Sequence, residues 1–169
     1  MYNILICDDQ PDIVSALKIY LAPEGYQLFE ASTGKQALQI VQQEDLHLIL
    51  LDIKHIDPEG HKTLTGHDNA GILAFARYLD EKKIPVWIRH VVVPGWTDDD
   101  ESLTALGRFM AQLKSVKALD VLPYHTLGVR KYQELGIPYP LEGVEPLEQK
   151  DAERARSVIL GAYREAKMT

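Results

Sequence analysis

Short apolar runs alternate with amphipathic stretches along this chain, and the alternation restricts the fold more than any other feature. Residues 3–7 and 47–53 are apolar at most positions, which is typical of strands buried on both faces of a parallel sheet. Between such runs, apolar residues recur at helical spacing, for example over residues 35–43. Repeated strand–helix–strand units with short connections predict an α/β fold in which helices cover a parallel sheet.

Five strands and six helices follow from this pattern. Strands are expected at residues 3–7, 26–30, 47–53, 85–93 and 118–122. Helices are expected at residues 12–21, 35–43, 69–82, 97–113, 129–135 and 151–166, with a polar loop or irregular helix over residues 55–68. Trp87 lies in the middle of the fourth strand and is expected in the core.

The overall composition excludes several classes of protein. The chain of 169 residues suits one domain, and its formal charge of −7 argues against non-specific nucleic-acid binding, which needs an excess of Lys and Arg. Its single cysteine allows neither an intrachain disulfide nor a cysteine-ligated iron–sulfur cluster. No apolar run is long enough to span a membrane, and no signal peptide is visible, so we expect a cytoplasmic protein without membrane contact.

Three carboxylates are expected at the ends of two strands. Asp8 and Asp9 follow the first strand, and Asp52 ends the third. Because parallel strands end on the same side of a sheet, these side chains converge if the strands are neighbours, and Mg²⁺ would neutralise them. The alternative is that Asp8 or Asp9 caps a helix and that Asp52 is an isolated strand-end acid.

Residues 2–54 resemble the receiver domains of two-component response regulators. The resemblance is carried by residues 4–9, 12–21, 25–26, 31–34, 37–38 and 50–53. It implies that Asp8 and Asp9 bind Mg²⁺ and that Asp52 accepts a phosphoryl group. The chain departs from the receiver pattern because residues 86–91 lack a Ser or Thr and residues 118–125 lack a lysine. The usual switching response is therefore not expected.

Residues from about 50 to 165 resemble a second family, the radical S-adenosylmethionine enzymes that activate pyruvate formate-lyase. This resemblance is carried by residues 51–54, 61, 64–66, 75–79, 86–89, 91–100, 122–125 and 127–128. It implies that Asp52, Lys54, Arg89 and His125 hold S-adenosylmethionine. The family's CxxxCxxC loop is missing from this sequence, so we expect no iron–sulfur cluster, no activating-enzyme activity and, on balance, no retained S-adenosylmethionine binding.

The two resemblances meet inside one expected strand, which favours an engineered chimera over a natural fusion at an exposed linker. We therefore expect a single α/β domain over residues 1–169, made of a receiver-like segment (residues 1–53) and an activating-enzyme-like segment (residues 54–169). The expected sheet is flavodoxin-like and doubly wound, with five parallel strands in the order 2-1-3-4-5. The alternative is an open half-barrel of βα units.

The functional expectation is a scaffold that is not an enzyme and that retains Mg²⁺-dependent phospho-acceptance at Asp52. Two alternatives stay open: a remnant S-adenosylmethionine site without radical chemistry, and a natural atypical receiver. An exposed sheet edge would favour a homodimer.

Overall fold

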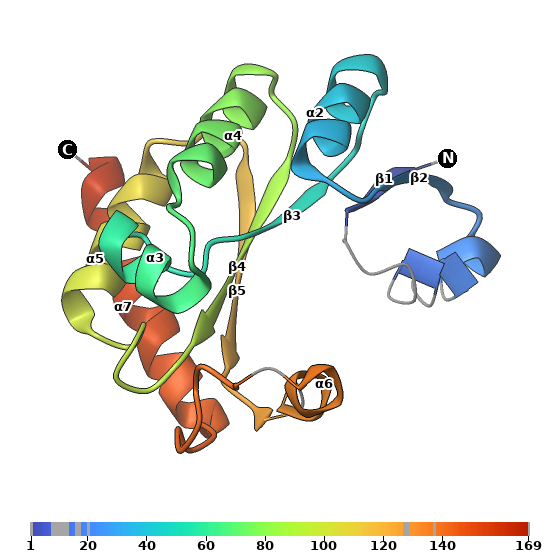
Figure 1. Ribbon diagram of the computed structural model, residues 1–169. Coiled ribbons are helices and arrows are strands. Elements are labelled where there is room, and N and C mark those ends of the chain that lie inside the picture. The colour runs from blue at the N-terminus through green and yellow to red at the C-terminus, as the bar shows by residue number, and fades with distance from the viewer. Residues whose placement is uncertain are drawn as a thin grey trace.

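The computed structural model describes residues 2–7, 14–15, 18–19, 21–126, 129–136 and 138–168 (Figure 1). The expected strands are all present, and the helices expected from residue 35 onward are confirmed. Half of the residues in the helix expected over residues 12–21 lie outside the described residues. The strands are β1 (Asn3–Cys7), β2 (Gln27–Ala31), β3 (Ile49–Asp52), β4 (Val86–Val92) and β5 (Val116–Pro123). The helices are η1 (Ala22–Glu24), α2 (Gly34–Gln43), α3 (Pro58–Thr65), α4 (Ala70–Glu81), α5 (Asp100–Ala111), α6 (Val129–Leu135) and α7 (Gln149–Met168).

The strands form two parallel sheets, one of two strands and one of three. The structure therefore does not show the single five-stranded sheet that we expected. β1 pairs with β2, and β3, β4 and β5 pair in sequential order. The two sheets meet at one isolated parallel bridge between Ile4 and Leu48. The backbone N–H of Asn3 bonds to Nδ1 of His47 at 3.1 Å, so a side chain takes the hydrogen bond that would have extended a ladder between the sheets.

Helices cover one face of the three-stranded sheet. Figure 1 shows α3, α5 and α7 gathered on the same side of β3, β4 and β5. Val86, Ile88 and Val92 of β4 point to that side and are almost fully buried, as are Leu103 of α5 and Ile159 of α7. Burying these side chains removes apolar surface from water, which is the main force that holds the helices on the sheet.

The opposite face of this sheet is open. Leu50, Trp87 and Leu122 keep 46%, 39% and 41% of their surface exposed, and Leu50 lies opposite Trp87 in the pairing of β3 with β4. The expectation that Trp87 belongs to the core is therefore wrong. Side chains alternate between the two faces of a strand, so burial of Val86 and Ile88 turns Trp87 outward.

Loop and helix boundaries follow ordinary capping chemistry. Asp57 accepts a hydrogen bond from the N–H of Gly60 at 2.8 Å and starts α3 within the segment expected to be a polar loop or irregular helix. Asp99 starts α5 in the same way through Ser102, near the beginning of the helix expected over residues 97–113. Among the described residues, no helix has the length and apolar character needed to cross a membrane.

Candidate functional site

An ion-paired cluster marks the carboxyl end of β3. Asp52 is the last residue of β3 and lies opposite Arg89 of β4. Nε of Arg89 donates to Oδ1 of Asp52, and a terminal nitrogen of Arg89 donates to Oδ2 at 3.1 Å. Nζ of Lys54 donates to the same Oδ2 at 2.8 Å. Two cations thus hold both oxygens of one carboxylate at a strand end, where ligands of open α/β sheets commonly bind.

The electrostatics of the cluster favour the ionised carboxylate. Burial by itself would raise the pKa of Asp52, but the hydrogen bonds and charges of Arg89 and Lys54 outweigh it and lower the pKa below its ordinary value. In turn, the hydrogen bond with Asp52 raises the pKa of Arg89. The side chains of Asp52, Lys54 and Arg89 remain 28%, 43% and 38% exposed, so a solute can reach them.

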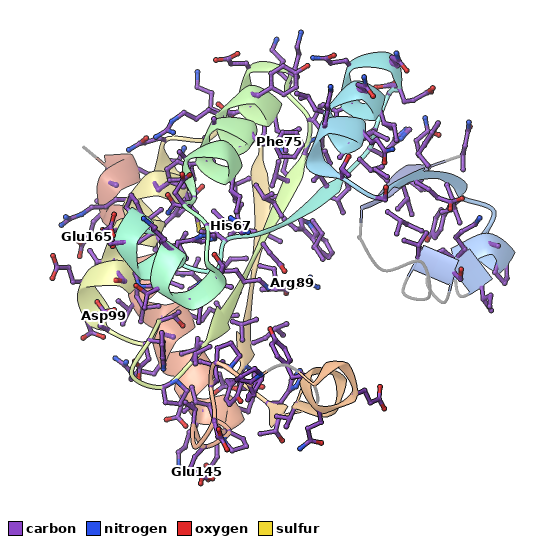
Figure 2. All side chains as sticks on the ribbon, in the orientation of Figure 1. His67, Phe75, Arg89, Asp99, Glu145 and Glu165 are labelled. Atoms are coloured by element: carbon purple, nitrogen blue, oxygen red, sulfur yellow. The ribbon has the colours of Figure 1, made fainter. Side chains whose placement is uncertain are left out.

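The cluster faces the open side of the sheet. Figure 2 shows Arg89 extending from β4 away from the helices that cover the other face. On its far side, Arg89 lies opposite Asp120 of β5, and this second acid also raises its pKa. An acid–base–acid row from Asp52 through Arg89 to Asp120 therefore crosses the middle of the open face.

His90 supports the cluster from the covered side. It follows Arg89 in β4, so its side chain points to the opposite face and is only 4% exposed. Its Nδ1 lies 2.8 Å from the carbonyl oxygen of Ile53, and its Nε2 lies 3.5 Å from that of Thr97. Burial lowers the pKa of His90, which favours the neutral ring. A neutral ring has one N–H to donate, and the shorter distance favours donation from Nδ1 to the carbonyl oxygen of Ile53 at the end of β3.

The structure brings together three of the residues expected to hold S-adenosylmethionine, namely Asp52, Lys54 and Arg89. The fourth, His125, is an exposed residue two positions beyond the end of β5. Asp8 and Asp9 lie outside the described residues, so the expected Mg²⁺ site stays a prediction. Within the described ranges, no group of three or more His, Cys, Asp or Glu side chains is placed to hold a metal ion.

Sequence reasoning missed a second group of residues, which line a pocket of about 330 Å³ beyond the end of β5. Tyr124, Tyr132, Tyr139 and Glu142 are among its walls. The segment over residues 137–146 reads as a loop punctuated by Pro and Gly. The only available signal was the spacing of three tyrosines on and around it.

Comparisons with known proteins divide the chain into two parts. Residues 4–66 match the response regulator receiver domain family. Over 99 residues, or 59% of this chain, the sequence is 61% identical to the pyruvate formate-lyase-activating enzyme of Streptococcus mutans, and 38% of that relative is covered. Over 112 residues, or 66% of this chain, it is 54% identical to the enzyme of the same name from Listeria monocytogenes, of which 45% is covered. The chain therefore spans less than half the length of these relatives.

A solved structure supports the fold. It is a domain of a pyruvate-formate lyase-activating enzyme from Bacteroides vulgatus, and it superposes with a TM-score of 0.65 over 96% of this chain and 95% of its own. Sequence identity in that alignment is 18%, so the likeness concerns the fold alone.

These comparisons confirm the two-part composition: a receiver-type segment at the N-terminus, and a C-terminal segment similar to the activating enzymes. The two parts overlap, because the 113-residue match to the Staphylococcus epidermidis relative is longer than the part of the chain outside residues 4–66. The expectation that the chain is not an enzyme is wrong as it stands, since relatives 54–61% identical over about 60% of the chain carry the name of an enzyme.

Proposed function

We propose that the Asp52–Lys54–Arg89 cluster binds the amino-acid end of S-adenosylmethionine, as one part of an activating-enzyme-type protein. The observation that carries this proposal is one carboxylate held between two cations on the open face of the sheet. The cluster belongs to the stretch that resembles the activating enzymes, and their names support this class of function.

The charges of the cluster complement a zwitterion. An α-amino acid presents an ammonium and a carboxylate on neighbouring carbons. Asp52 can accept hydrogen bonds from the ammonium, while Lys54 turns from Asp52 to the carboxylate. Arg89 can hold Asp52 through one edge of its guanidinium and offer its remaining N–H groups to the same carboxylate. Each group exchanges one ionic partner for another, so binding leaves no charge of the cluster or of the ligand's amino-acid end unpaired.

Titration calorimetry with S-adenosylmethionine tests this proposal. We expect saturable heat with the unaltered chain, and binding about tenfold weaker or more in Asp52→Asn and in the double variant Arg89→Ala plus His125→Ala, because each charge-assisted hydrogen bond contributes on the order of 1–3 kcal/mol. Asp120→Asn is the matched control. Asp120 is also an acid on the open sheet face, and it lies beside Arg89 on β5 instead of β3. Heat that persists in both site variants would disprove the assignment.

A second candidate function is phospho-acceptance at Asp52, which is supported by the receiver-family match over residues 4–66. The carboxylate would attack the phosphorus of a small phosphodonor and form an acyl phosphate, while the leaving group departs with the donor's bonding electrons. Asp8 and Asp9 would hold the Mg²⁺ that offsets the phosphoryl charge. Lys54 and Arg89 occupy both oxygens of Asp52, so one cation must withdraw before attack.

Incubation with acetyl phosphate and Mg²⁺, followed by intact-mass analysis, tests this second candidate. The expected result is a gain of one phosphoryl group that requires Mg²⁺ and is lost in Asp52→Asn. Absence of any mass gain in the unaltered chain would exclude phospho-acceptance from this donor without affecting the proposal on S-adenosylmethionine.

We further infer that the chain is an engineered chimera whose two parts were joined near the Asp52 strand. Neither family match covers the whole chain, and the two matches overlap. The two resemblances seen in the sequence meet at the strand that ends in Asp52, whereas natural fusions usually join at exposed linkers. A natural genome that encodes this sequence without interruption would contradict the inference.

A further inference from the structure

The pocket beyond β5 lies outside the Asp52 cluster and has a different chemistry. Its walls come from three segments: the end of β5, helix α6, and the loop before α7. Eleven of the described residues line it: Tyr124, Thr126, Val129, Tyr132, Gln133, Pro138, Tyr139, Leu141, Glu142, Gly143 and Val144. At about 330 Å³, it falls within the usual range of small-molecule sites.

The aromatic walls are held in place before any ligand arrives. The hydroxyl groups of Tyr124 and Tyr139 bond to each other at 2.8 Å. The ring of Tyr132 meets that of Tyr139 edge-on, with centroids 5.0 Å apart and an interplanar angle of 70°. Tyr124 is itself 4% exposed, and its carbonyl oxygen accepts from the N–H of Leu147 at 3.1 Å, which anchors the far end of the loop. Such pre-organisation lowers the entropic cost of binding.

The charged residues of the lining determine whether the pocket favours a cationic or an anionic ligand. Among the described side chains of the lining, Glu142 is the one that is charged, and none of them is Lys, Arg or His. Burial, followed by the hydrogen bond to Tyr124, raises the pKa of Tyr139, so the Tyr139 hydroxyl stays neutral. The chain as a whole carries a formal charge of −7, which attracts cations to its surface. An anionic ligand would therefore find no positive partner among the described lining residues.

We propose that this pocket binds a small organic cation of the quaternary ammonium type. The faces of aromatic rings are electron-rich and attract a cation whose methyl groups cannot donate conventional hydrogen bonds. Tyr132 and Tyr139 form two walls that meet at a steep angle, and Glu142 supplies the opposite charge. The remaining apolar wall, which includes Val129 and Leu141, suits the body of such a ligand.

Choline and its neutral carbon isostere 3,3-dimethylbutan-1-ol test the proposal, with binding followed by calorimetry or ligand-observed NMR. Because the two have nearly the same shape, any preference reports the charge. We expect choline to bind about tenfold more tightly, in line with cation–π attraction in a partly desolvated site. Equal binding of the two compounds, or no binding of choline, would overturn the proposal.

Variants locate the site. Glu142→Gln should weaken choline several-fold without affecting the isostere, and Tyr132→Leu should weaken choline while Tyr132→Phe retains it, because Phe keeps the ring. Tyr2→Leu is the matched control, a tyrosine 63% exposed on β1's amino-terminal side. Circular dichroism checks the fold of each variant. If Tyr132→Leu unfolds, Glu142→Gln decides, and unchanged choline affinity in that variant would overturn the assignment.

Discussion

Arg89 lies opposite Asp52 in the neighbouring strand and holds its carboxylate through two N–H groups, although the two residues are 37 positions apart in the chain. The pair fixes the register of β3 on β4 at the strand end, and Lys54 adds a second cation to it. Because β3 has no continuous partner on its other side among the described strands, this ion pair holds the edge strand of the three-stranded sheet.

Neutralising Asp52 should therefore destabilise the fold. In Asp52→Asn, two cations lose their counter-charge, and we expect the free energy of unfolding to fall by about 1 kcal/mol at neutral pH, since the pair is only partly buried. The pKa of Asp52 in the folded state is below its ordinary 3.8, so its contribution is fully present above that value and is lost as the pH falls through the folded-state pKa.

Urea denaturation over a series of pH values measures this effect. The difference between the unaltered chain and Asp52→Asn should be constant near neutral pH and shrink in strong acid. Asp120→Asn serves as the control on the same sheet face. A difference that did not change with pH would show that Asp52 acts through packing and not through its charge.

His90 should cause a second loss of stability toward acid, at a higher pH than the loss expected from Asp52. Burial lowers its folded-state pKa from the ordinary 6.5, so the unfolded chain binds this proton more readily. Stability contributed by the neutral ring is present above pH 6.5 and is lost as the pH falls through the folded-state pKa. In His90→Gln, the loss of unfolding free energy between neutral pH and pH 5 should be smaller than in the unaltered chain. An equal loss in both chains would contradict this account.

The strands were predictable because their residues are apolar over short runs, and the observed bounds differ from the expected ones by at most about two residues at each end. The separation of β1 from β3 was not predictable. Whether the N–H of Asn3 bonds to a strand carbonyl or to the ring of His47 depends on side-chain geometry that no periodicity encodes. The exposure of Trp87 was missed for a related reason, because alternation shows which residues share a face but not which face is covered.

The two candidate sites also differ in how far they could be predicted from the sequence. The cluster around Asp52 could be approached from sequence, since acids at strand ends converge in parallel sheets and the resemblance supplied Lys54 and Arg89. The tyrosine pocket could not, because Tyr124, Tyr132 and Tyr139 come from a strand end, a helix and a loop. Only the packing of these three segments brings the rings together.

Two helical glycines differ in whether a neighbouring helix leaves room for a side chain. A Cβ on Gly107 of α5 would overlap the carbonyl oxygen of Ile159 and lie 2.9 Å from Cβ of Ala162, both on α7. Gly107→Ala should therefore force α5 and α7 apart and cost about 1–3 kcal/mol. Gly161→Ala, on α7 with nothing within 4 Å of the added Cβ, is the matched control and should stabilise by up to about 1 kcal/mol. Thermal unfolding of both variants checks the pair, and equal effects would disprove the close approach.

The open sheet face leads to a prediction about assembly. Leu50, Trp87 and Leu122 expose apolar surface on one side of the sheet, next to the β3 edge, and such a surface favours association with a second copy. We expect concentration-dependent dimerisation in sedimentation equilibrium, and we expect Trp87→Lys to abolish it because a charge would be buried at the contact. Met168→Lys is the control. It also replaces an exposed apolar side chain by lysine, but Met168, which is 88% exposed, lies at the end of α7 and away from the sheet. A chain that stays monomeric at high concentration, or a Trp87→Lys variant that still dimerises, would exclude this face as the interface.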